Sequence, residues 1–170
     1  MYKRQGVNKG VLRKNKIDVR EPFVKKLIQK NPNIIFDIYG YQKKQPIWSS
    51  DFYDALYKSK MALNLSRINN IKYYSSNRIA SLIGNGILTF VDINTKLNNF
   101  FSDNEVIFYK DLNDLTNKIS YYKVNHKKRN LIAKNGKRKY FKIFNDNIIA
   151  DYICARFVNT KVKKQYSWMN

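Results

Sequence analysis

The residues best suited to chemistry lie close together between positions 72 and 78. Ser75 and Ser76 stand where a helix would begin, and Arg78 falls in its first turn. The first turn of a helix carries N–H groups without intrahelical partners and a partial positive charge, so it favours anions. Arg78 and Lys72 add full positive charges at the same end. These residue types at this spacing indicate a site for a phosphate-bearing ligand.

The flanking sequence contains the elements that would position this site. Residues 61–65 form a short apolar run typical of a strand, and the residues after Ser76 have the period of a helix. Gly84 and Gly86 are expected to end that helix in a tight turn, and residues 87–91 predict a second strand. A strand, a helix and a strand in this order make a βαβ unit. Ligands of such sheets bind beyond the carboxyl ends of the strands.

The rest of the chain continues the alternation of helices and strands. Further strands are predicted at residues 33–39 and 106–109. Helices are predicted near residues 22–30, 50–57, 94–101, 112–122, 127–144 and 146–162. This pattern predicts an α/β fold, namely a Rossmann-like parallel sheet flanked by helices, with further helices at the C-terminus.

Composition restricts the possible classes of protein. The 170 residues are 44% hydrophobic, which indicates a globular domain rather than a disordered chain. A net charge of +21 would attract nucleic acids, anionic membranes or phosphorylated ligands, although a genome rich in A and T would also place many lysines on a solvated surface. One histidine, His126, and one cysteine, Cys154, cannot form a zinc site, and we expect Cys154 to be a buried structural thiol.

At these residues the sequence resembles the C-terminal, nucleotide-sugar-binding domain of GT-B glycosyltransferases (glycosyl transferases group 1), especially the CgeB-like proteins. Ser59 and Lys60 match a Ser-Lys pair near a strand end, Arg78 matches an arginine at a helix start, and Gly86 matches a closing glycine. Ser81 stands where that family usually has a glutamate that holds the ribose of the donor. A serine lacks the charge and the second oxygen of a carboxylate, so the identity of the nucleotide is open.

The resemblance implies a set of ligands and partners. The residues expected to hold the donor and its diphosphate are Arg78, Ser75, Ser76, Asn77, Ser81, Lys60, Lys72 and Tyr74. The donor would be a nucleotide-diphosphate sugar acting as substrate, with no cofactor and no metal. The acceptor would be a glycan, a lipid-linked molecule or a protein, and no specific nucleic acid is expected. The expected location is the cytoplasm, with a peripheral contact at the inner face of the membrane.

The resemblance also predicts how the chain is organised. Residues 1–18 are expected to be a linker or remnant, and residues 19–170 the donor-binding domain. The opening residues 1–5 resemble a translated sequencing adaptor, so we expect a fragment that lacks an N-terminal acceptor domain with the catalytic residues and is inactive alone. Two other hypotheses stay open. The charge favours a basic nucleic-acid-binding module, and Ser81 favours a noncatalytic, degenerate glycosyltransferase-like domain.

Overall fold

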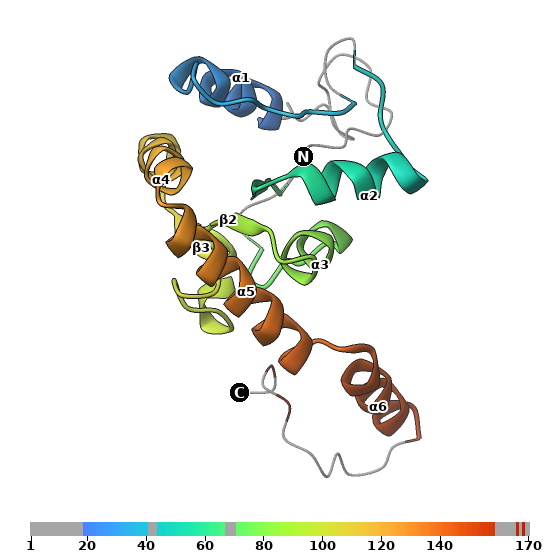
Figure 1. The fold of residues 1–170 in the computed structure, drawn as a ribbon. Helices are drawn as coiled ribbons and strands as arrows, with labels where there is room; N and C mark the ends of the chain where they lie inside the picture. The colour runs from blue at the N-terminus through green and yellow to red at the C-terminus, as the bar shows by residue number, and fades with distance from the viewer. Residues whose placement is uncertain (1–18, 41–43, 67–70, 159–165, 167, 169–170) are drawn as a thin grey trace.

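The computed structural model describes residues 19–40, 44–66, 71–158, 166 and 168. The predicted linker at residues 1–18 lies outside this part of the chain. Three parallel strands form one sheet in the order β1-β2-β3: β1 (Met61–Asn64), β2 (Leu88–Asp92) and β3 (Ile107–Tyr109). Helices cover both faces of this sheet (Figure 1). The predicted α/β, Rossmann-like class is therefore confirmed.

The described residues contain six α-helices. They are α1 (Arg20–Lys30), α2 (Ser49–Lys58), α3 (Asn77–Gly84), α4 (Leu112–Val124), α5 (His126–Ile143) and α6 (Asp146–Phe157). These bounds confirm the helices predicted from periodicity near residues 22–30, 50–57, 112–122 and 127–144 and the helix after Ser76. The helix predicted at residues 146–162 is confirmed as far as Phe157, and residues 159–162 lie outside the described part of the chain. The predicted helix at residues 94–101 is wrong as one element, because it is two 3₁₀ turns, η3 (Ile93–Thr95) and η4 (Leu97–Asn99). Lys96 separates the two turns with a left-handed φ of 58°.

The predicted strand at residues 33–39 is also wrong. Its side chains alternate in burial, from the 92% exposed Ile35 to the buried Ile38, as an extended chain should. A strand, however, also needs a hydrogen-bonded neighbour, and among the described residues β1 pairs with β2 alone. An apolar cavity of about 410 Å³ is lined on one side by residues 34–38 and on the other by β1. The sequence shows the alternation of buried and exposed side chains, but it does not show whether a neighbouring strand is present to pair with this segment.

The two faces of the sheet bury different side chains. Phe90 of β2 and Tyr109 of β3 point to the face covered by α1 and α4, where they pack with Leu27 and Leu115. Side chains of the alternate residues point to the face covered by α3. On that face the buried set comprises Ile79, Ile83, Val91, Leu97, Phe101, Val106, Phe108 and Ile143. The sheet is thus a middle layer whose strand ends lie at two edges.

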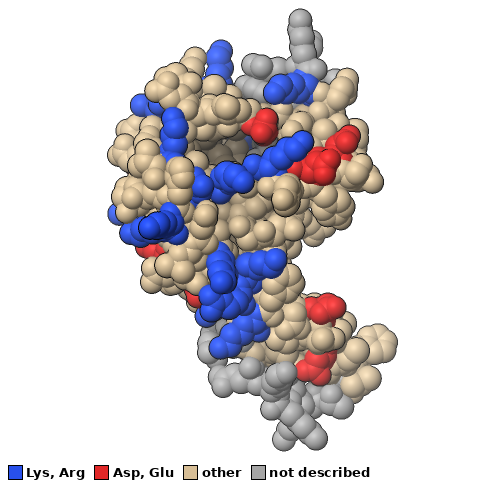
Figure 2. Space-filling view, in the orientation of Figure 1, with Lys and Arg blue, Asp and Glu red and all other residues tan. Residues whose placement is uncertain are grey.

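Helix α5 crosses the edge at which the strands begin. Gly86, which precedes β2, lies against Ala133 and Lys137, and Gly136 lies against the backbone of Glu105, which precedes β3. Figure 1 shows α5 running diagonally across the sheet, and Figure 2 shows Lys and Arg side chains gathered over it. The amino edge of the sheet is therefore covered by a basic helix.

Helix α6 stands away from the sheet (Figure 1). None of its residues, all of which the structure describes, is buried. Cys154 lies on this helix and is exposed, so the expectation of a buried thiol is wrong. The sequence around Cys154 has the apolar periodicity of a buried helix. A helix, however, buries only the face that packs against another element of the protein.

The close contact at Gly136 provides a test of this packing. A methyl group at this position would collide with the carbonyl oxygen of Glu105, whereas a methyl group at Gly84 would meet only the Phe141 ring at 3.9 Å. We expect Gly136→Ala to lower the free energy of unfolding by about 1–3 kcal/mol, because a backbone contact cannot move aside cheaply. Urea unfolding measures the change.

The matched control is Gly84→Ala, also within a helix. Alanine has the higher helix propensity, so this variant should be as stable as the parent or up to about 1 kcal/mol more stable. Equal stability of the two variants would contradict the described packing of α5 against the amino edge.

Candidate functional site

The end of β1 and the start of α3 are joined by Arg78. Its Nη1 donates a hydrogen bond of 2.7 Å to the carbonyl oxygen of Leu65, which directly follows β1. The guanidinium is partly buried, so one side of it holds this strand end. Arg78 therefore fixes the first turn of α3 beside the carboxyl edge of the sheet.

The amino terminus of α3 is not closed by a side chain. Ser76 is the N-cap residue and has extended dihedral angles (φ −114°, ψ 164°), yet its side chain makes no capping hydrogen bond within the described part of the protein. Asn77 and Ser75, on either side of it, are exposed. Terminal N–H groups of a helix are satisfied by caps, water or ligands. Among the described residues, the first turn of α3 thus has no N-cap side chain that a bound anion would have to displace.

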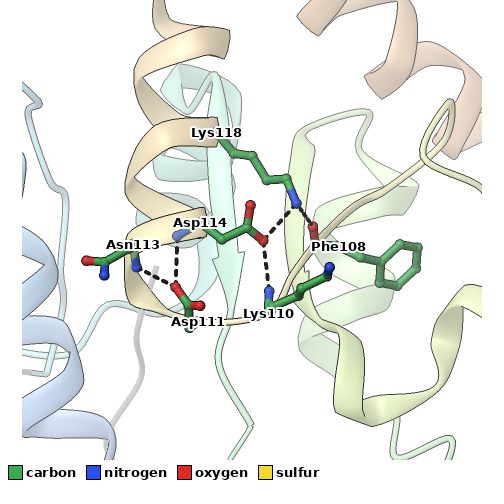
Figure 3. Close-up of polar contacts among 6 residues, drawn as sticks. All are labelled: Phe108, Lys110, Asp111, Asn113, Asp114 and Lys118. Carbon is green, nitrogen blue, oxygen red and sulfur yellow. Dashed lines mark hydrogen bonds and ion pairs between the residues drawn. The ribbon is translucent and has the colours of Figure 1, made fainter.

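Helix α4 begins at the same edge of the sheet, and its amino terminus is closed (Figure 3). Asp111 accepts hydrogen bonds from the backbone N–H groups of Asn113 and Asp114, at 2.8 and 2.9 Å. Asp114 accepts from the N–H of Lys110 at 2.9 Å and from Nζ of Lys118 at 2.8 Å. Two carboxylates therefore occupy the positive end of α4. The start of α4 is therefore unsuited to a further anion.

The Asp114 carboxylate is stabilised in its charged form. Burial raises its pKa, but the hydrogen bonds from Lys118 and from the Lys110 backbone, together with the two lysine charges, outweigh burial and leave the pKa below its ordinary value. Lys118 Nζ also donates to the carbonyl oxygen of Phe108 at 2.6 Å. This network ties the end of β3 to the first turn of α4.

The segment before α3 is held by contacts of Tyr73. Its N–H donates to the carbonyl oxygen of Thr95 at 2.8 Å, and its hydroxyl accepts a hydrogen bond from Asn99 at 2.7 Å, which lowers the pKa of the phenol. The ring packs on Phe100 with centroids 4.8 Å apart, and Nζ of Lys72 lies 4.7 Å from its centre. A φ of 62° is costly for a tyrosine, and these contacts to the segment after β2 offset that cost.

Buried polar residues at the strand ends were missed by the sequence analysis. Asn64 ends β1 and is only 2% exposed, and its Oδ1 has no hydrogen-bond partner among the described residues. Ser66 follows it and is buried, and Asp92 is buried at the end of β2. Such groups normally find partners, in protein or in bound molecules. The available signal was a polar residue closing each apolar run.

The structure brings together one part of the predicted set. Arg78, Asn77 and Ser76 lie in or next to the first turn of α3. Ser75, Lys72 and Tyr74 come from the segment that leads into this turn, and all three are exposed. The ring of Tyr74 is thus accessible, whereas that of Tyr73 is packed against Phe100. These six residues form a continuous group at the carboxyl edge.

Other residues of the predicted set lie elsewhere. Ser81 is one helical turn further along α3, where its hydroxyl donates to the carbonyl oxygen of Asn77 at 2.9 Å. Gly84 ends α3, and Gly86, with a left-handed φ of 71°, forms the turn into β2. Lys60 directly precedes β1 and lines a surface hollow together with Gly86. Lys60 and the two glycines thus lie at the amino edge, opposite Arg78.

The start of α3 at the carboxyl edge is rich in hydrogen-bond donors. A helix start, a guanidinium and neighbouring hydroxyl and amide groups are all donors. Among the residues that the structure describes, no three His, Cys, Asp or Glu side chains come close enough together to hold a metal ion. The residues at the start of α3 carry N–H and O–H groups of the kind that bind phosphate oxygens.

Comparison with protein families agrees with this geometry. The glycosyl transferase-like family matches residues 13–155, which include the whole sheet and helices α1 to α5. The chain belongs to the glycosyl transferase-like family. No curated protein and no solved structure matches this glycosyl transferase-like chain. None of its described helices is both long and apolar enough to cross a lipid bilayer.

The capping network at α4 predicts a pH-dependent loss of stability. The lowered pKa of Asp114 means that its contribution is present above the ordinary carboxyl pKa of about 4 and is lost as the pH falls through the folded-state value. We expect Asp114→Asn to be about 0.5–1 kcal/mol less stable than the parent near neutral pH. The difference should shrink in acid, which urea unfolding at several pH values measures.

Exposed Asp103 provides a control for the change in net charge, since Asp103→Asn removes the same charge. Its unfolding curve should follow the parent at every pH. A stability difference for Asp114→Asn that stays constant into acid would contradict the role of its charge.

Proposed function

We propose that this protein is the donor-binding domain of a glycosyltransferase that takes its sugar from a nucleotide-diphosphate donor. The observation that carries the proposal is the uncapped first turn of α3 beside the partly buried guanidinium of Arg78. The family match supports sugar transfer as the chemistry. In this proposal the domain has the C-terminal position of a GT-B enzyme and is CgeB-like.

The diphosphate of the donor would lie at the start of α3. The backbone N–H groups of the first turn would donate to its oxygens, and the helix dipole would add a partial positive charge. Arg78 and Lys72 would neutralise the remaining charge. When the sugar leaves, negative charge builds on the diphosphate, and these fixed donors stabilise that charge without reorganising.

The nucleoside would extend from the diphosphate toward neighbouring side chains. The exposed ring of Tyr74 is suited to stack on a base. Ser81 would face the ribose with one hydroxyl, whose hydrogen already bonds to the carbonyl of Asn77, so it can only accept a hydrogen bond there. We therefore expect weaker ribose recognition than a glutamate would give.

Binding and activation of the acceptor would need another domain. The acceptor would be a glycan, a lipid-linked molecule or a protein, and its activating base would come from an N-terminal domain of a longer protein. The proposed location is the cytoplasm, peripheral at the inner face of the membrane.

Replacement of Arg78 tests the proposed site. We expect Arg78→Ala to weaken the binding of UDP or GDP by about 10-fold to 100-fold, because it removes charge-assisted hydrogen bonds worth about 1.5–3 kcal/mol. Titration calorimetry measures the affinity. Arg138→Ala on α5 removes the same charge from an exposed position and should leave the affinity unchanged.

A second variant separates nucleotide binding from folding, because Arg78 also holds the end of β1. Asn77→Asp puts a carboxylate in the first turn of α3, which favours the helix by about 0.3–1 kcal/mol but repels a phosphate. We expect a stable protein with weaker nucleotide binding. Asn147→Asp makes the same change near the start of α6 and serves as the control. Unchanged nucleotide affinity in both Arg78→Ala and Asn77→Asp would overturn the proposal.

A further inference from the structure

One line of side chains follows the solvent face of α5. The residues recur at intervals of three or four, which places them on one face of a helix. We call this line the α5 stripe, and it comprises Lys127, Leu131, Lys134, Arg138, Phe141 and Lys142. All six side chains are exposed. The opposite face, with Ile132, Gly136 and Ile143, is buried in the protein.

The charged side chains of α5 are all positive. Its sequence contains no Asp or Glu. Its basic residues are Lys127, Lys128, Arg129, Lys134, Lys137, Arg138, Lys139 and Lys142. Figure 2 shows blue atoms gathered over the region of α5, with few red atoms among them. Such a concentration produces a positive potential over this face of the molecule.

Two large apolar side chains lie within this charged line. Leu131 is 58% exposed and Phe141 is 51% exposed. They do not belong to the core, because the buried face of α5 points the other way. Basic residues mixed with Leu and Phe are typical of helices that lie in the interface of an anionic membrane, where the cations meet headgroups and the apolar groups enter the acyl boundary.

A surface hollow adjoins the α5 stripe. It has a volume of about 710 Å³, and three lysines line it: Lys60, Lys134 and Lys137. Tyr53 and Tyr57 border the same hollow, and Asp54 is the one acidic residue in its lining. The lysines could neutralise phosphate groups, and tyrosine rings are favoured at the level of lipid headgroups. The hollow extends the same chemistry from α5 toward α2.

From these features we infer that the α5 stripe docks the protein on an anionic phospholipid bilayer. Leu131 decides against a nucleic acid as the partner, because duplexes are held by cations and polar groups and offer an aliphatic side chain on a helix surface little contact. The inference deepens the peripheral location proposed above by naming its surface. The stripe lies at the amino edge, whereas the proposed nucleotide site at α3 lies at the carboxyl edge. A variant can therefore lose vesicle binding without losing nucleotide binding, and the reverse.

Vesicle flotation tests the inference. The protein should bind phosphatidylcholine vesicles that contain phosphatidylglycerol and not vesicles of phosphatidylcholine alone. Each basic side chain near an anionic surface contributes about five-fold to binding, so Lys134→Ala with Arg138→Ala should weaken it roughly 30-fold. Lys25→Ala with Lys26→Ala removes the same charge from exposed positions on α1 and should have a much smaller effect.

A second pair of substitutions tests the apolar part at unchanged charge. Leu131→Ser with Phe141→Ser should weaken vesicle binding by about tenfold or more, because both side chains are then better solvated in water than at the membrane. Unfolding curves check that each variant is folded. Equal losses from the α1 and α5 charge pairs would overturn the inference. So would full vesicle binding by the Leu131 and Phe141 variant, or tighter binding of a DNA duplex than of vesicles at moderate salt.

Discussion

The proposed ligand site depends on the hydrogen bond from Arg78 to the carbonyl oxygen of Leu65. This bond joins the end of β1 to the first turn of α3, so that the strand end, the helix dipole and a guanidinium share one place. The contacts of Tyr73 with Thr95 and Asn99 then fasten the segment before α3 to the segment that follows β2. The donors of the site are therefore fixed by the protein before any ligand arrives.

The two edges of the sheet are used differently. At the amino edge, α5 covers the starts of β2 and β3 through the close approaches at Gly86 and Gly136. At the carboxyl edge, the start of α4 is closed by Asp111 and Asp114, whereas no side chain caps the start of α3 in the described part of the chain. This difference supports the proposal that a diphosphate binds at α3. The basic surface of α5 lies at the opposite edge, and we propose a separate role for it.

Much of the fold could be predicted from the sequence because periodic apolar residues report which face of each element is buried. The βαβ unit around α3 followed from such runs and from Gly84 and Gly86. The prediction of a strand at residues 33–39 failed because the local sequence does not show whether a neighbouring strand forms hydrogen bonds with it. The prediction that Cys154 is buried failed for a related reason, because periodicity does not show whether α6 packs against another element.

The site was predictable only in part. Arg78 and Ser76 were identifiable because helix starts have recognisable residues and a known affinity for anions. Lys60 was grouped with them by its place in a motif, but the direction of β1 puts it at the opposite edge. The buried Asn64 was missed because an isolated polar residue in an apolar run carries no sign of its partners. Spatial neighbours across the sheet required the structure.

Backbone amide shifts during a titration of the isotope-labelled protein with UDP are the most direct test of α3 as the anion site. The account predicts the largest shifts at Ser76, Asn77 and Arg78, with smaller ones at Ser66, and none at Gly86. Shifts centred on Gly86 and the hollow beside α5, with the α3 amides unmoved, would contradict it.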